Sequence, residues 1–328
     1  LRADAFYAGS ARLPLGLLSH ADQFRHWQSS RPDARVSSGW FGHLADALQP
    51  GRSASQIPMN ISLSGSNLVQ NGVYSSHYSI TDKGSVGLEV NTVRNALNDQ
   101  LLQSFESQLG QQYPGDPFKQ TYTAQLREAQ AQHEVFRRAT SRVKMSQPFS
   151  DSPLSQQLRQ VAISIAAAEA LNLPQQTFFV RYIGWDHHDE LLNKHSEMLT
   201  VLSRALAEFQ HALEALGQAG NTVTFTGSDF GRTLTSNGNG TDHGWGGNMI
   251  VMGQPVNGGQ IYGEYPSLSL ANNPLNVGDG VLIPTLSTDQ VYAPLARWFG
   301  VAQSSLSTLF PNLANVEHRD ALRTLLRS

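Results

Sequence analysis

The apolar positions of the chain follow two periodicities, which together predict a mixed α/β fold. Runs of β-branched and aromatic residues at 177–183 and 222–226 are typical of buried strands. Apolar residues at helical spacing predict long amphipathic helices over 191–216 and 288–299, the second ended by Gly300. A strongly apolar stretch predicts a further helix over 154–173, opened by Ser152-Pro153. Weaker patterns predict a helix over 21–29, strand segments within 60–72 and 248–252, and a weakly helical end over 306–326. We therefore predict one α/β domain over 1–328, a three-layer sheet flanked by helices.

The segment 88–150 interrupts this alternation with a helical pattern of its own. Apolar residues recur at helical spacing from Leu88 to about Met145, and the turn residues 113–117 divide the pattern in two. The segment is rich in Gln and Ala, and we interpret its histidine, His133, as a solvated surface residue. We expect 88–150 to form a helical insertion or cap within the domain.

Composition narrows the classes of function. The chain has 328 residues, a net charge of −3 and 15% charged residues, and the two signs are interspersed, so no basic stripe is present for nucleic acid. No apolar run has the length of a membrane span. The absence of cysteine excludes disulfides, thiolate zinc sites and a cysteine nucleophile. The chain begins at Leu1 without a signal-like segment, so we expect further residues to precede it in the full protein.

Acidic and imidazole side chains follow the predicted strands. Asp186 and His188 come after the strand 177–183, Asp229 comes after the strand 222–226, and His243 lies in a glycine-rich loop before the strand 248–252. Parallel neighbouring strands place their carboxyl ends at one sheet edge, where ligands usually bind. We therefore expect these four side chains to converge on a divalent metal ion, for which zinc, manganese and calcium are the candidates.

Three further residues are possible ligands or supports of this site. His20, at the start of a predicted helix, is the best candidate among the scattered histidines of the first fifty residues. His195 follows His188 by two helical turns, and Asp242 precedes His243 directly.

A structural interpretation of these residues competes with the metal site. Asp186 and Asp189 stand just before a predicted helix, where aspartates commonly cap the first turn. Asn-Gly and similar pairs around Asp242 are ordinary turn sequences, and loop Asp and His residues are often only solvated. Capping does not explain three loops together, which favours the metal site over a protein without any ion.

The same segments resemble a known family. FTGSDFGRTLTSNGNGTDHGWGG, GWDHHDELLNKH and DGVLIPTLSTDQVYAPLARWFGV are similar to the domain of unknown function 1501 family, exported bacterial proteins that often carry a twin-arginine signal. Ser19-His20 and SGWFG at 38–42 match its earlier part. That family resembles the alkaline phosphatase and sulfatase superfamily. The resemblance implies a metal role for Asp186, His188, Asp229 and His243, and a periplasmic or exported location.

The chain also departs from the phosphatase pattern. Phe230 stands where the phosphatase relatives usually have a histidine after the aspartate, and the strand that carries the nucleophile in the superfamily would lie before Leu1. The resemblance thus implies a hydrolase of small anionic phosphate or sulfate esters, in which Arg232 stabilises the transferred group or serves as a structural ion-pair partner. The alternative is a non-catalytic exported binding or assembly protein that keeps a structural ion.

Overall fold

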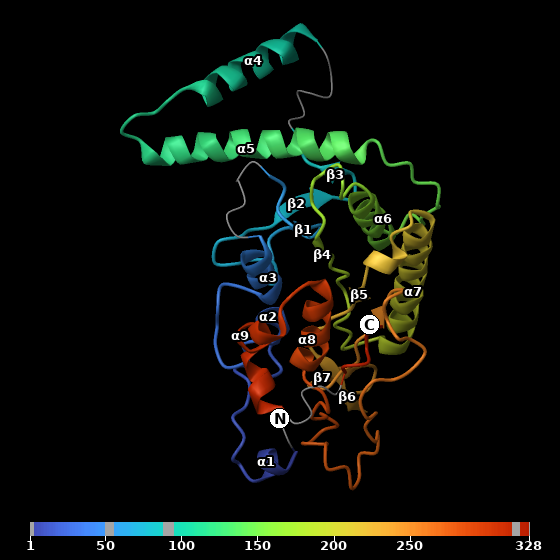
Figure 1. Cartoon of the computed structure of the whole chain (residues 1–328). Coiled ribbons are helices and arrows are strands. Elements are labelled where there is room, and N and C mark those ends of the chain that lie inside the picture. Colours follow the sequence, from blue (N-terminus) through green and yellow to red (C-terminus); the bar gives the residue numbers. More distant parts are fainter. Residues whose placement is uncertain (1–2, 50–55, 88–94, 317–321, 328) are drawn as a thin grey trace.

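A computed structural model describes residues 3–49, 56–87, 95–316 and 322–327 (Figure 1). The α-helices are α1 (Ala3–Tyr7), α2 (His20–Ser29), α3 (Trp40–Leu48), α4 (Ala96–Gly110), α5 (Pro117–Thr140), α6 (Pro153–Ala166), α7 (Leu191–Ala215), α8 (Thr288–Phe299) and α9 (Leu306–Leu309). Short 3₁₀ helices lie at Ala219–Asn221, Gln303–Ser305 and Pro311–Asn315. The strands are β1 (Asn60–Ser62), β2 (Tyr78–Thr81), β3 (Gly84–Ser85), β4 (Thr177–Phe179), β5 (Thr224–Phe225), β6 (Gly231–Ser236), β7 (Thr241–Gly244) and β8 (Val251–Met252).

The mixed α/β class and the strongest helices are confirmed. Helix α8 has the predicted bounds because a capping box between Ser287 and Gln290 begins it and Gly300, at φ 117°, ends it. Helix α7 ends within one residue of the prediction. Helix α6 begins as predicted, with Ser152 as N-cap and Pro153 in the first turn, but it ends at Ala166, several residues early.

The strands are shorter than predicted, and they do not form one parallel edge. Within the described residues the largest sheet has the order β3-β2-β1-β4, in which β1 pairs in parallel with both β2 and β4. Strand β5 instead pairs antiparallel with β8, and β6 pairs antiparallel with β7. The expectation of parallel neighbours was therefore wrong, because β-branched runs favour extended backbone without specifying the partner strand.

The glycine-rich segment around His243 was also predicted incorrectly as a loop. It is the β6–β7 hairpin, in which Arg232 lies opposite His243 in the strand register. Its turn is closed by Asn237, which accepts a hydrogen bond from the Gly240 N–H through its side chain. The Asn-Gly pairs form the turn, as the alternative interpretation held, and the strands beside the turn carry Arg232 and His243.

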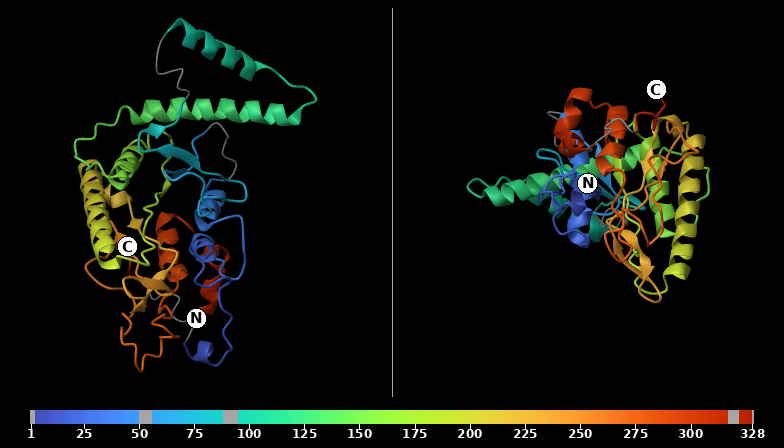
Figure 2. Two further views of the ribbon diagram at one scale, coloured as in Figure 1. Left: turned by 180° about the vertical axis from the view of Figure 1, so that it is seen from behind. Right: turned by 90° about the horizontal axis from the view of Figure 1, so that it is seen from below.

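Helices α4 and α5 form a hairpin, the arm (residues 96–140), which lies across one end of the molecule. The arm extends beyond the other elements on one side (Figures 1 and 2). Residues 88–94 of the predicted insertion lie outside the described residues. His133 on α5 is half-buried, and its Nδ1 lies 2.8 Å from the Ser85 hydroxyl of β3, so the interpretation of His133 as a solvated residue was wrong.

The core lies between the four-stranded sheet and the helices of both halves of the chain. Trp40 of α3 stacks on Tyr292 of α8 with ring centroids 4.6 Å apart, and Phe310 packs against both. These three side chains are almost completely buried. This aromatic cluster fixes α8 against the N-terminal segment, and the same segment carries His20. Within the described part of the chain, no helix combines the length and apolar character that crossing a bilayer requires.

Candidate metal centre

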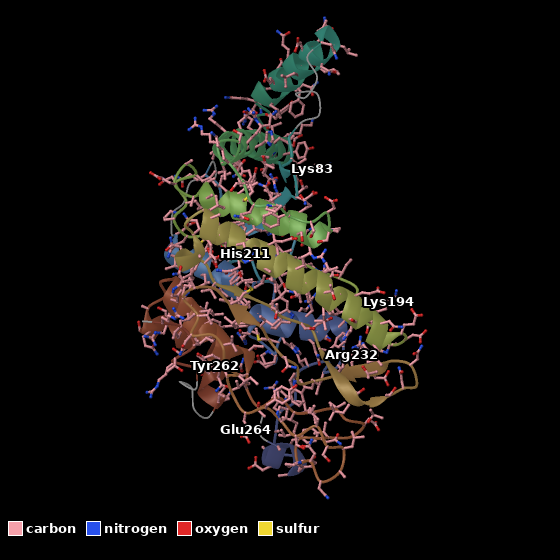
Figure 3. All side chains as sticks on the ribbon, turned by 90° about the vertical axis from the view of Figure 1, so that its right-hand side faces the viewer. Lys83, Lys194, His211, Arg232, Tyr262 and Glu264 are labelled. Atoms are coloured by element: carbon pink, nitrogen blue, oxygen red, sulfur yellow. The ribbon has the colours of Figure 1, made fainter. Side chains whose placement is uncertain are left out.

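Three distant segments bring two imidazoles and a carboxylate together. His20 begins α2, Asp186 lies in the loop between β4 and α7, and His243 lies in β7. One donor atom of each lies within 4.8 Å of the other two. Figure 3, in which Arg232 is labelled, shows the β6–β7 hairpin close to the Lys194 end of α7. Of the predicted residues, Asp186 and His243 belong to this central group, and His20 joins them.

His243 is oriented by a backbone contact. Its Nδ1 lies 2.9 Å from the carbonyl oxygen of Leu18, so the Nδ1–H donates there and the lone pair is left on Nε2. That Nε2 lies 3.2 Å from Oδ1 of Asp186. Two atoms that both carry lone pairs thus face each other, an arrangement that requires a shared proton or a cation between them.

His20 repeats this arrangement from the other side of Asp186. Its Nδ1 lies 2.6 Å from Oδ2 of Asp229, and its Nε2 lies 3.1 Å from Oδ2 of Asp186. The hydrogen bond to Asp229 is the largest cause that raises the pKa of His20, against the opposing effect of burial. Asp229, predicted as a ligand, therefore lies behind His20 and orients it, as carboxylates do behind many metal-bound histidines.

Asp186 is the hub of the cluster. Its Oδ1 also lies 2.9 Å from His188 Nε2, as an ion-pair contact, and accepts a hydrogen bond from Arg232 at 3.0 Å. Burial opposes ionisation of Asp186, but the hydrogen bond from His20 and the nearby imidazoles of His188 and His243 outweigh it and lower the pKa of the carboxyl group. Asp186 does not cap α7, whose N-cap is Glu190 without a side-chain capping bond. The capping interpretation of Asp186 is therefore wrong.

His188 joins the cluster through Asp186 and is supported by Asp242. The Nδ1 of His188 lies 3.2 Å from Oδ1 of Asp242, and Asn237 donates a hydrogen bond to the His188 carbonyl oxygen. Close packing holds this loop against the hairpin, since a Cβ atom at Gly240 would lie 2.4 Å from the His188 carbonyl carbon. Asp242 thus supports His188. His188 contacts Asp186 but is not one of the three residues of the central group.

Arg232 is held by the protein through three hydrogen bonds. Its guanidinium donates to the carbonyl oxygens of Trp185 and Thr241, at 2.8 and 2.7 Å, as well as to Asp186. Its side chain is mostly buried, and its charge lies beside the carboxylate. This geometry matches the ion-pair role predicted as the alternative. A direct role in stabilising a transferred group stays a prediction.

His195 lies away from the central group. It contacts Trp185 and His187 edge to face, with the two histidine ring centroids 5.1 Å apart. Desolvation is the largest cause that lowers the pKa of His195. Helix α7 begins at Leu191, after His188, so the two-turn spacing does not place the two histidines on one helical face.

Phe230 is a wall of the site that sequence reasoning did not foresee. Its ring stacks on His243 with centroids 4.0 Å apart and an interplanar angle of 13°, and it meets His20 edge to face at 4.7 Å. The Arg232 guanidinium lies 5.0 Å from the centroid of the same ring. From the sequence, Phe230 was interpreted only as the residue that replaces a histidine ligand after Asp229. Arg232, two positions further on, was the feature of the sequence that indicated a packing role for the ring.

The donor set fits a divalent cation. Two imidazole nitrogens and one carboxylate oxygen suit zinc or manganese better than calcium, which prefers oxygen ligands alone. The side chains of His20 and Asp186 are 48% and 40% exposed, so the group opens to solvent on one side. A cation held there would have three protein ligands and an accessible side.

Comparison with known proteins places the chain in a family. No curated protein and no solved structure matches it. Residues 8–307 match the family described as proteins of unknown function, DUF1501. That match spans the His20, Asp186 and His243 segments and most of the chain. The protein therefore belongs to the DUF1501 family.

Proposed function

We propose that this protein is a metal-dependent hydrolase of phosphate or sulfate esters, whose metal is held by His20, Asp186 and His243. One observation carries the proposal. Both imidazoles commit Nδ1–H to an acceptor, and both turn Nε2 toward the same carboxylate, at 3.1 and 3.2 Å. Nitrogen and oxygen lone pairs in this arrangement favour a cation.

The residues around the group support hydrolysis in distinct ways. A bound divalent ion would polarise the ester oxygen and lower the pKa of an attacking water or hydroxyl. Asp229 orients His20, and Arg232 holds Asp186 while placing positive charge beside the site. The exposed side of the group gives a small anionic ester access. The superfamily resemblance supports this substrate class and an exported location.

A second candidate is an exported binding or assembly protein that keeps the ion as a structural element. Phe230 favours this second candidate. Its aromatic ring covers one side of His243 and His20, where a polar side chain would supply a further metal ligand. The Ser228 hydroxyl near the site donates to the Phe230 carbonyl oxygen at 3.0 Å and is not assigned as a nucleophile.

Elemental analysis of the purified protein tests the site. We expect zinc or manganese in the wild type and its loss in His243→Ala. His211→Ala is the matched control. His211 lies on α7, far from Arg232 of the candidate site (Figure 3), so this variant should keep the metal. Wild-type protein that binds neither ion after incubation with each would overturn the proposal.

Cobalt substitution separates the two candidates. Added phosphate or sulfate should change the visible spectrum of the cobalt protein if an accessible coordination position faces a pocket, and a panel of aryl phosphate and sulfate esters should then reveal chelator-sensitive turnover. A cobalt spectrum indifferent to both anions, with no turnover, would favour the structural ion.

A further inference from the structure

The segment that carries Asp186 begins with an exposed arginine. Arg181 follows the end of β4 by two positions. Its backbone N–H donates to the Ser64 hydroxyl oxygen at 2.8 Å, and its guanidinium lies 5.2 Å from the centroid of the Phe24 ring. No carboxylate of the described residues forms an ion pair with Arg181. The arginine is thus held by the main chain and an aromatic ring, and its guanidinium donors stay available.

The contacts of α2 place Arg181 close to the candidate metal centre. His20 and Phe24 are four residues apart, so they lie on the same face of α2. His20 contacts Asp186, and Phe24 contacts Arg181. Helix α2 therefore runs antiparallel to the segment 181–186, with a rise of roughly 6 Å between the two contacts.

The fold of the segment itself agrees with this short separation. The rings of Tyr182 and Trp185 meet edge to face with centroids 5.4 Å apart. Gly184, between them, has φ 108°, a backbone conformation that suits glycine in a turn. The chain therefore turns back between Arg181 and Asp186 and keeps the two side chains on one side of α2.

The position of Arg181 in the sheet is one at which ligands commonly bind. Strands β1 and β4 are parallel neighbours, so their carboxyl ends lie at the same edge. Ser64 follows β1 by two positions, as Arg181 follows β4. The Ser64 hydroxyl accepts the Arg181 N–H and keeps its own hydrogen to donate. A cation and a hydroxyl donor therefore stand together at this edge.

Arg232 differs from Arg181 in how its donors are used. The guanidinium of Arg232 is committed to Asp186 and to two backbone carbonyl oxygens, and its side chain is mostly buried. Arg181 has no such commitments. A guanidinium binds phosphate and carboxylate groups through paired N–H donors, which suits the exposed arginine for an anionic ligand.

We propose that Arg181 and the Ser64 hydroxyl form an anion subsite beside the candidate metal centre, which binds a second anionic group of the substrate, a phosphate or a carboxylate. This inference rests on the proposed hydrolase function and narrows its substrates. They are esters whose second negative group lies roughly 6 to 10 Å from the ester, one helical turn plus the reach of the guanidinium.

Calorimetric titration of the zinc-loaded protein with phosphonates tests the subsite. Alkylphosphonates offer one anionic group to the metal, and α,ω-alkane bisphosphonates of the same chain lengths offer a second group to Arg181. We expect one chain length of bisphosphonate to bind roughly fivefold more tightly than its matched alkylphosphonate, the contribution of an exposed ion pair.

The two proposals fail in different ways in this titration. Alkylphosphonate binding without a gain for any bisphosphonate would overturn the subsite and leave the proposed function standing. A protein that binds no phosphonate, with zinc or with manganese, would refute the proposed function and this inference with it.

Variants assign the gain to Arg181. Arg181→Gln should abolish the gain and leave alkylphosphonate binding unchanged, and Arg181→Lys should keep part of it, because it keeps the charge without the planar fork. Arg25→Gln is the matched control, since Arg25 is exposed on α2 beside Phe24 and its loss removes the same charge. Circular dichroism verifies that each variant is folded. A gain that persists in Arg181→Gln, or an equal loss in Arg25→Gln, would overturn the subsite.

Discussion

Two aspartates of this protein lie in opposite electrostatic surroundings. The side chain of Asp186 is 40% exposed; burial opposes its ionisation, but the contact with His20 and the nearby imidazoles of His188 and His243 outweigh burial and hold its pKa below the usual range. Asp289, in the first turn of α8, is 3% exposed, and burial raises its pKa to about 6, with the nearby Ser30 hydroxyl acting in the opposite direction. The comparison shows that partners, more than the carboxyl group itself, decide which aspartate keeps its charge.

The two sites also differ in how completely their polar atoms are paired. Oδ2 of Asp289, the hydroxyl of Tyr292 and the indole N–H of Trp40 have no hydrogen-bond partner among the described residues. Both oxygens of Asp186 have polar partners, because Oδ1 accepts a hydrogen bond from Arg232 and Oδ2 faces Nε2 of His20. Asp186 is therefore a well-paired carboxylate in the candidate site, whereas ionisation of the unpaired, buried Asp289 at neutral pH costs stability.

Asp186→Asn should have the largest effect, on metal affinity. The amide removes the anionic oxygen at the centre of the group, and we expect a loss beyond the roughly 100-fold upper range of supporting residues. Titration against a chromophoric chelator measures it. Asp189→Asn, in the same loop but outside the central group, should retain affinity. Equal affinities of Asp186→Asn and the wild type would contradict the role of Asp186.

Asp289→Asn should change the dependence of stability on pH. Because its folded pKa of about 6 lies above the ordinary 3.8, protonation of Asp289 favours the folded state. This contribution of the protonated carboxyl group to the free energy of unfolding is fully present below about pH 4, and it is lost as the pH rises through about 6. At pH 8 the variant should be more stable by up to about 3 kcal/mol, and at pH 4 the gain should vanish.

Urea unfolding at both pH values measures this difference. Asp279→Asn, an exposed loop aspartate, is the control and should match the wild type at each pH. A stabilisation by Asp289→Asn that is the same at pH 4 and pH 8 would mean that ionisation of Asp289 is not its cause.

Phe230→Leu should have a smaller effect on the metal site. Loss of the stacked ring leaves His243 and Arg232 less well oriented, and an aromatic pair contributes about 0.5–1.5 kcal/mol, or roughly a tenfold change in affinity at most. The chelator titration used for Asp186 measures it. Phe230→Tyr keeps the ring and should bind normally, so a similar loss in both variants would point away from stacking.

Tyr292→Phe should have the smallest effect. Its hydroxyl is buried without a partner among the described residues, and its ring keeps the stack on Trp40 without it. We expect the free energy of unfolding to rise by no more than about 1 kcal/mol. A clear loss of stability would show that the hydroxyl is hydrogen-bonded, for instance through a buried water, and would revise the comparison with Asp186.

The sequence predicted the long helices and named the residues of the candidate metal centre, but it did not predict how those side chains are arranged. Capping residues at Ser152, Ser287 and Gly300 act locally, so α6 and α8 begin where predicted, and α8 also ends there. The convergence of Asp186 and His243 was predicted from one parallel sheet edge. In the structure β5 and β8 pair antiparallel in a sheet separate from that of β4. The residues meet because the β6–β7 hairpin packs against the loop after β4, through Arg232 and Gly240.

His20 shows most clearly what the sequence could not locate. It was the best candidate among the early histidines, but it lies 166 residues from Asp186, and no local pattern indicates that the two side chains meet. Its place in the cluster follows from contacts that only the folded chain makes, those with Asp229, Asp186 and Phe230. His195, which had an apparently suitable spacing, lies apart because α7 begins too late.

The sequence by itself determined the residue types available for chemistry, the α/β class, and the helices that local capping and apolar periodicity specify. Tertiary structure decided which strands pair, which imidazoles face Asp186, and which aspartate has a lowered and which a raised pKa. The physical reason is range: capping and periodicity act over a few residues, whereas pairing, desolvation and ion pairing depend on groups distant along the chain.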